Sequence, residues 1–118
     1  MTKLAKLIAT EEGFFRSGTL PNRNNNPGDL RHGPHEQHPG DPDAIGVVDN
    51  VADGWSDLER QLQLDASRGM TLGQAIYSWA PPSENDSAAY LDFIIAGFGG
   101  VVDANTPLSQ VLEIEEEA

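Results

Sequence analysis

The spacing of apolar residues predicts five α-helices, and the first of them lies at the start of the chain. Leu4, Leu7 and Ile8 recur at intervals of three and four positions, which places them on one face of a helix. Thr2 is a residue type that caps helix starts, and Gly13 stands where the helix would end. We therefore expect a helix between these two residues, with its apolar face turned towards a core.

Four further helices are expected after residue 49. Their apolar positions are, in order, Trp55, Leu58 and Leu62; Leu72, Ala75, Ile76 and Trp79; Ala89, Tyr90, Phe93 and Ile94; and Leu108, Val111 and Leu112. Arg68-Gly69, Pro81-Pro82 and Gly99-Gly100 are expected to end the first three of these four helices. Thr106 is expected to cap the last one, with Pro107 in its first turn.

Between residues 16 and 46 the chain is dense in turn formers and shows little helix or strand signal. Ile45, Val47 and Val48 favour a short strand that pairs with the segment around Leu30 and Arg31. Compact domains rarely carry so long a loop unless it is functional or mobile. The expected fold class is therefore mainly α, of the α+β kind, with about five helices, a small β-hairpin and one long loop.

Length and composition favour a single domain. The chain has 118 residues, of which 38% are hydrophobic and 22% are charged, enough for a modest core. We assign residues 1–112 to this domain and residues 113–118 to an acidic tail that we expect to fray. There is no cysteine, which excludes disulfides and thiolate chemistry.

The charge is strongly acidic, because 19 Asp and Glu stand against 7 Lys and Arg and give a net charge of −12. Such a surface repels nucleic-acid phosphates and anionic headgroups, so we expect no nucleic-acid partner and no membrane insertion. No stretch is long enough to span a membrane, and Glu11 and Glu12 interrupt the start of the chain too early for a signal peptide. We expect a product made in the cytoplasm that reaches any outside target by another route.

A carboxylate pair at the end of the first expected helix is the first candidate for chemistry. Glu11 and Glu12 would lie in the last turn, where the helix dipole disfavours negative charge. Phe14 follows closely, and apolar surroundings raise the pKa of a carboxyl group towards the range of a general acid. The alternative is that both glutamates are simply solvated, as most are.

Two polar segments are further candidates. Residues 24–28 (Asn-Asn-Asn-Pro-Gly) predict a turn whose amides suit sugar hydroxyls and N-acetyl groups, although such turns often bond only to themselves. After the proline break, Asn85 or Asp86 opens a helix in which Tyr90 follows one turn in as a core residue. This interpretation leaves Glu84 and Asn85 without a specific structural task.

Six potential metal ligands lie close together in the long loop, namely His32, His35, Glu36, His38, Asp41 and Asp43. Residues 35–38 lack the i, i+4 histidine spacing of a zinc-protease helix. From Asp41 onward the chain imitates a calcium loop, but Ile45 and Ala52 occupy positions that need oxygen ligands. We therefore expect no metal site and no cofactor, with a His/Asp metal protein as a competing hypothesis.

Taken in order, three of these segments resemble a known family. They are Glu-Gly-Phe at residues 12–14, Arg-Asn-Asn-Asn-Pro-Gly-Asp-Leu at 23–30 and Ala-Pro-Pro-Ser-Glu-Asn-Asp-Ser-Ala-Ala-Tyr at 80–90. The intervening Asp-Gly-Trp at 53–55 and Glu-Arg-Gln-Leu at 59–62 fit as well. The chain resembles small phage-type lytic transglycosylases and endolysin-related proteins of the lysozyme-like superfamily, and the similarity spans about residues 4–98.

The resemblance implies a lysozyme-like fold, in which the first core helix delivers one catalytic glutamate into a cleft between a helical lobe and a small β-containing lobe. Glu12 matches that catalytic position, and Glu11 is the second choice. The residues that would bind substrate in the cleft are Asn26, Asp29, Glu84, Asn85 and Tyr90. The family loop commonly reads Asn-Pro-Gly-Asn, whereas the last residue is Asp29 here, which raises the question of a second carboxylate.

The activity implied by the resemblance is cleavage of peptidoglycan strands or chitooligosaccharides, in peptidoglycan between N-acetylmuramic acid and N-acetylglucosamine. Protonated Glu12 would donate to the glycosidic oxygen. Acting alone, Glu12 would then serve as base on the muramic acid 6-hydroxyl and give a 1,6-anhydro product, the route we favour. If Asp29 or Glu84 faces Glu12 across about 6.5–9.5 Å, inverting hydrolysis by water becomes available.

A second hypothesis is a non-catalytic glycan-binding module or virion structural component with the same fold. The acidic charge motivates it, since a freely acting wall-cleaving enzyme profits from a basic surface against an anionic wall. In either case we expect the protein to meet the cell wall after its release or as part of a virion.

Overall fold

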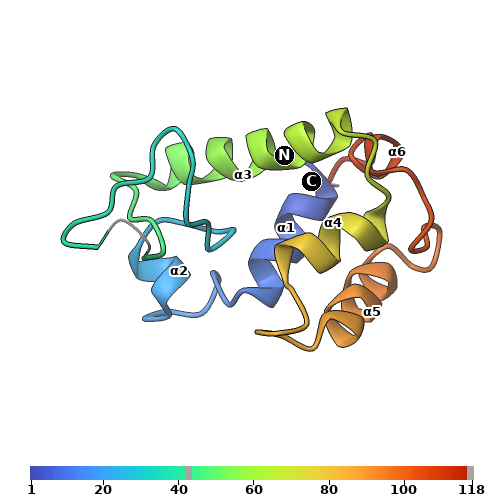
Figure 1. Cartoon of the computed structure of the whole chain (residues 1–118), viewed down its shortest axis with the longest axis horizontal. Helices are drawn as coiled ribbons and strands as arrows, with labels where there is room; N and C mark the ends of the chain where they lie inside the picture. Colours follow the sequence, from blue (N-terminus) through green and yellow to red (C-terminus); the bar gives the residue numbers. More distant parts are fainter. Residues whose placement is uncertain (42–43, 117–118) are drawn as a thin grey trace.

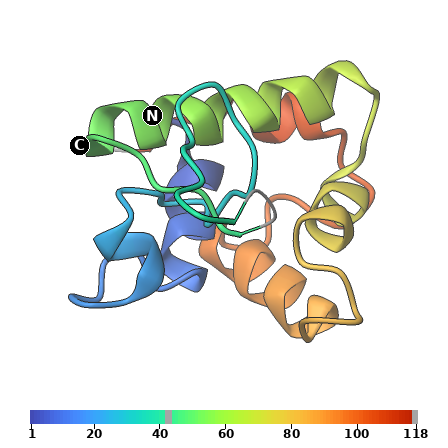
Figure 2. The same cartoon turned by 60° about the vertical axis from the view of Figure 1, so that its left-hand side comes forward.

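The computed structural model describes residues 1–41 and 44–116. Within these residues the chain forms six helices, α1 (Lys3–Glu11), α2 (Leu20–Arg23), α3 (Val51–Ser67), α4 (Leu72–Trp79), α5 (Ser87–Gly97) and α6 (Leu108–Val111). The mainly α class is therefore confirmed, with one helix more than expected. α3 runs along one side of the molecule in both views (Figure 1, Figure 2). The long loop with α2 lies at the opposite end from α5 and α6 in Figure 1. No helix of the described residues is both long enough and apolar enough to cross a membrane.

α1 begins and ends where the sequence predicts. The Thr2 hydroxyl accepts the Ala5 N–H at 3.2 Å and so caps the start of the helix. Glu12 is the C-cap residue, and it is followed by Gly13 with a φ of 83°, a conformation that suits glycine. The helix therefore stops at Glu12 and leaves that side chain at its tip.

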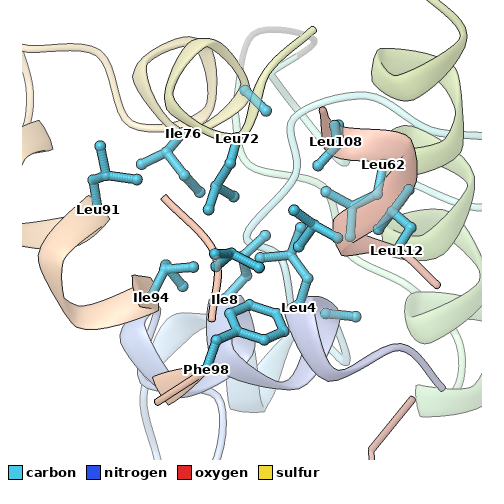
Figure 3. Close-up of a cluster of buried hydrophobic side chains, with 14 of the residues drawn as sticks. Leu4, Ile8, Leu62, Leu72, Ile76, Leu91, Ile94, Phe98, Leu108 and Leu112 are labelled. Atoms are coloured by element: carbon cyan, nitrogen blue, oxygen red, sulfur yellow. The ribbon is translucent and has the colours of Figure 1, made fainter. Parts of the chain in front are cut away.

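One continuous hydrophobic core joins the helices. Its largest fully buried side chains are Leu4, Ile8, Leu58, Leu62, Leu72, Ile76, Ile94, Leu108 and Val111. All of them occupy the apolar stripes predicted from the sequence, and Figure 3 shows side chains from several helices converging on the apolar face of α1. Burying each of these side chains stabilises the fold by about 1.5–3 kcal/mol. Two residues of the predicted stripes, Ala89 and Phe93, are exposed instead, Phe93 to 36%.

Two helix starts differ from the prediction. α2 lies in the segment expected to be loop, where the Thr19 side chain caps a single helical turn with Pro21 near its start. At α6 the predicted cap is wrong, because Pro107 is the N-cap residue and makes no side-chain cap bond. The Thr106 hydroxyl instead accepts the Asp103 N–H at 2.9 Å, a local turn bond that competes with helix capping.

The predicted β-hairpin is reduced to isolated pairing within the described residues. Gln37 and Val47 exchange both backbone hydrogen bonds, at 2.8 and 2.9 Å, as a single antiparallel bridge. The expected pairing near Leu30 consists of one bond, in which the Gly46 N–H donates to the Leu30 carbonyl at 2.9 Å. Prolines and glycines on both sides of Gln37 interrupt any longer ladder, since they lack a donor or weaken strand geometry.

The acidic tail is paired with the amino terminus through residue 116. The Lys3 N–H donates to the Ile114 carbonyl at 3.1 Å, and Lys6 Nζ lies 3.0 Å from a Glu116 carboxylate oxygen. Backbone pairing and a nearby lysine thus hold a segment whose like charges alone would keep it loose. Residues 117–118 lie outside the described part of the chain.

A single buried amide ties the long loop together. Asn26 is fully buried, and its Nδ2 donates to the carbonyls of Leu30 at 2.8 Å and Gly46 at 2.9 Å. Its Oδ1 accepts the Leu30 N–H at 3.0 Å. The loop rests on α3 at Gly54, where an added Cβ would lie 1.9 Å from the Asn25 carbonyl oxygen. One side chain therefore joins two parts of the loop, and the glycine allows the loop to reach α3.

Replacing Asn26 with alanine should lower the free energy of unfolding by about 2–4 kcal/mol, because three buried backbone groups lose their partner. Urea denaturation followed by circular dichroism measures this loss. Asn105→Ala changes an exposed turn asparagine and should alter stability by less than about 0.5 kcal/mol. Equal stability of the two variants would show that Asn26 does not hold the loop.

Candidate functional site

A groove runs between the long loop and the end of α4. It consists of two adjoining hollows of about 340 and 330 Å³. Both hollows are lined by Gly28, Asp29, Arg31, Trp79 and Glu84. The smaller one also contains Glu12, Ile45 and Asn85. Because the two hollows share so many residues, they form one continuous open groove.

Glu12 presents a carboxyl group to this groove from the tip of α1. The Tyr90 hydroxyl donates a hydrogen bond of 2.7 Å to Glu12 Oε2. Burial, opposed by the hydrogen bond from Tyr90 and reinforced by the negative charges of Asp29 and Glu11, raises the pKa of Glu12 to about 7. A carboxyl group with this pKa is protonated in about half of the molecules at neutral pH, which suits a proton donor.

Tyr90 lies behind Glu12 and does not line either hollow. It stands one turn into α5, whose start is fixed by Asp86 accepting the Ala89 N–H at 3.0 Å. Its side chain is buried, and burial together with the neighbouring Glu12 raises the pKa of Tyr90 above its usual value. The hydroxyl therefore keeps its proton and remains a donor to Glu12. Tyr90 was expected in the lining of the cleft, whereas the structure places it outside both hollows with its hydroxyl bonded to Glu12.

Asp29 is the second carboxylate of the groove, and it lines both hollows. Its backbone is in the left-handed region, with a φ of 52°, and its N–H donates to the Asn26 carbonyl at 3.0 Å. One carboxylate oxygen, Oδ1, is buried without a hydrogen-bond partner. Burial raises the pKa of Asp29, while the positive charge of Arg31 partly opposes the shift.

Glu84 and Asn85 also reach the groove, on the segment between α4 and α5. Glu84 is well exposed, at 60% of its side chain, and its carboxylate lies 3.9 Å from a guanidinium nitrogen of Arg31. The N–H groups of both residues donate to the Pro81 carbonyl, at 2.9 and 3.0 Å. The proline break therefore forms a tight turn that holds these two side chains opposite the long loop.

The structure does not bring Asn26 to the groove. Its amide lies under the loop and is used entirely by the backbone of Leu30 and Gly46. The turn is therefore self-bonded and Asn26 lines neither hollow, and a substrate-binding role for it stays a prediction. Asn26 acts on the groove only indirectly, because it shapes the turn that carries Asp29.

Trp79 and Arg31 line the groove but were not among the predicted site residues. The sequence places Trp79 on an apolar helical stripe, yet it is the last residue of α4 and only partly buried. An aromatic residue two positions before a proline break was the available signal, since a helix end exposes one side of the ring. Arg31 had no comparable signal, because its position follows from the folded loop alone.

Comparisons with family models, with curated proteins and with solved structures give no match to this chain. Any functional conclusion therefore depends on the geometry of the groove and on the sequence motifs that form it.

The histidine-rich loop does not form a metal site in the part of the chain that the structure describes. There, no three His, Asp or Glu side chains are grouped so that they could hold an ion. His35 is instead bonded to Asp57 of α3, with its backbone N–H 3.0 Å and its Nδ1 2.6 Å from the carboxylate oxygens. His38 Nε2 contacts the Arg31 carbonyl, and Asp43 lies outside the described residues.

Glu36 and Asp57 form a buried carboxyl pair beneath this loop. Burial, together with the hydrogen bond to Asp57 and its charge, raises the pKa of Glu36 to about 8. Burial alone would also raise the pKa of Asp57, but hydrogen bonds from Glu36 and His35 lower it. Glu36 is therefore mostly protonated at neutral pH, which avoids a second negative charge beside the buried Asp57 carboxylate.

Replacing Glu36 with glutamine should stabilise the protein at alkaline pH. The stabilising effect of protonated Glu36 is complete below its usual pKa of 4.5 and is lost as the pH rises through about 8. The amide is neutral at every pH and never places a second negative charge beside Asp57, so the variant should gain about 1–2 kcal/mol over the wild type near pH 9, and little near pH 5.

Urea denaturation at several pH values measures this difference. Glu113→Gln removes an exposed carboxylate of the same type and should show no such dependence on pH. A constant stability difference between Glu36→Gln and the wild type across the range would contradict a protonated Glu36.

Proposed function

We propose that this protein is a glycosidase that cleaves peptidoglycan between N-acetylmuramic acid and N-acetylglucosamine, with Glu12 as the general acid. The proposal depends above all on the half-buried Glu12 carboxyl, which opens into a groove, has a pKa of about 7 and is oriented by Tyr90. A glycosidic bond needs such an acid, because its leaving oxygen must be protonated as the bond breaks.

The hydrogen bond from Tyr90 decides which oxygen of Glu12 delivers the proton. Tyr90 donates to Oε2, so in the neutral carboxyl group the proton resides on Oε1. This arrangement leaves one defined O–H for the glycosidic oxygen. Because the donor is already oriented, the acid loses less conformational entropy on reaching the transition state.

The shape and lining of the groove are those of a site for an extended polar chain. Two joined hollows accommodate consecutive units of a polymer better than one compact ligand. Trp79 offers an aromatic surface for a sugar ring, while Asn85 and Arg31 offer donors for hydroxyl and acetamido oxygens. The ordered resemblance to lysozyme-like proteins supports the same class of substrate.

The alternative is a glycan-binding or virion structural module that keeps the groove without turnover. The net charge of −12 favours it, because an acidic protein is repelled by an anionic wall. Binding of chitooligosaccharides without release of soluble fragments from purified sacculi would support this alternative over the glycosidase.

Replacing Glu12 with glutamine should lower the rate of peptidoglycan cleavage by about 10²–10⁴-fold, because the amide cannot donate the proton. Release of soluble muropeptides from purified sacculi, followed by mass spectrometry, measures the rate. Glu11→Gln is the matched control, since Glu11 is exposed and lines neither hollow; it should keep most of the activity. The reverse result would make Glu11 the acid.

The pH dependence of cleavage should follow the protonation of Glu12. Because protonated Glu12 is the active form, activity should fall as the pH rises through about 7. The Tyr90 hydrogen bond lowers the pKa of Glu12, so Tyr90→Phe should move this fall to higher pH. Tyr77→Phe changes an exposed tyrosine of α4 and should leave the profile in place. An unshifted profile in Tyr90→Phe would mean that another group sets it.

A further inference from the structure

Asp29 lines the groove, yet one of its carboxylate oxygens is buried without a hydrogen-bond partner. It lines the same hollow as Glu12, and its negative charge is close enough to raise the pKa of Glu12. The turn that carries it is anchored by the buried amide of Asn26, and its backbone has the left-handed φ of 52°. Its Oδ1 is covered by protein and takes no hydrogen bond, so the folded protein does not compensate the desolvation of this oxygen.

We propose that Asp29 is a second catalytic residue, the general base that activates water, and that the enzyme is an inverting hydrolase. This assignment rests on the proposed glycosidase function. Catalysis requires a base whose proton affinity is not already satisfied by hydrogen bonds, and desolvation increases that affinity. The two carboxyl groups then have separate tasks at opposite faces of one sugar ring.

The reaction balances with these two groups and one water. Protonated Glu12 gives its proton to the glycosidic oxygen, and the bond from that oxygen to the anomeric carbon breaks. Water adds to the anomeric carbon from the opposite face, and its proton passes to Asp29. Glu12 is left as a carboxylate and Asp29 as a carboxylic acid, and exchange with solvent restores the starting protonation.

Glu84, the other carboxylate of the groove, is less suited to this task. Its side chain is 60% exposed, and its carboxylate lies 3.9 Å from the Arg31 guanidinium. The Glu84 carboxylate is therefore solvated and lies near a positive charge, whereas Asp29 Oδ1 is buried without a hydrogen-bond partner. We therefore assign the base in the smaller hollow to Asp29 and not to Glu84.

The test compares Asp29→Asn and Asp29→Gly with the wild type on purified sacculi. Both replacements tolerate a positive φ, so the turn is retained. Unreduced products are analysed by mass spectrometry, because a hydrolysed muramic acid end is one water heavier than a 1,6-anhydro end. The wild type should yield hydrolysed ends. Asp29→Asn should lose about 10²–10⁴-fold of that rate, and its residual products should shift towards anhydro ends made by Glu12 alone.

Azide provides a second readout, because this anion attacks the anomeric carbon without needing a base. Adding sodium azide should increase turnover by Asp29→Gly and give a glycosyl azide, whereas Glu12→Gln should gain nothing. Asp92→Asn, an exposed replacement of the same type on α5, should retain wild-type rate and products. A residue with a merely structural role would not change the ratio of products or respond to azide.

The outcomes separate this assignment from the proposed function. Wild-type cleavage that yields only anhydro ends, or Asp29→Asn that hydrolyses within a few-fold of the wild-type rate, overturns the role of Asp29 and leaves the glycosidase intact. No cleavage of sacculi by the wild type overturns the glycosidase and this assignment together.

Discussion

The arrangement of the groove depends on the hydrogen bonds of one buried side chain, the amide of Asn26. Its three bonds hold Leu30 and Gly46 beside each other, although sixteen positions separate these residues along the chain. A loop of this length has few apolar contacts of its own, so its conformation must be specified by polar groups with defined geometry. The turn that follows Asn26 then carries Gly28 and Asp29 into the groove. A residue that lines neither hollow thus determines where the Asp29 side chain lies.

The opposite side of the groove is specified differently, by the ends of helices. α1 stops at Glu12 because Gly13 adopts a positive φ, and α5 starts at Asp86 so that Tyr90 faces the tip of α1. A negative charge at the carboxy end of a helix is disfavoured by the helix dipole, and burial adds to the cost. Both effects favour the protonated form of Glu12. The same placement that weakens the helix therefore prepares an acid.

The helices and their core were predictable from the sequence, because the apolar residues that repeat at helical spacing, Leu4, Ile8, Leu62 and Ile94 among them, are the ones that pack together. The positions of Glu12 and Glu84 in one groove could be expected only through the resemblance, since local patterns do not reveal long-range proximity. The role of Asn26 was missed because an amide suited to a sugar is equally suited to a carbonyl group. The bond from Tyr90 to Glu12 joins residues 78 positions apart, and no local pattern in either segment indicates it.

Gly54 lets α3 affect the groove, although Gly54 lines neither hollow. The loop carbonyl of Asn25 rests where a side chain at this helical position would begin. Any larger residue would push the loop away from the helix. The same loop forms one wall of the groove. The position of the loop, and with it the width of the groove, therefore depends on the missing side chain of Gly54. A substitution at Gly54 would therefore alter the groove from a helix position that lines neither hollow.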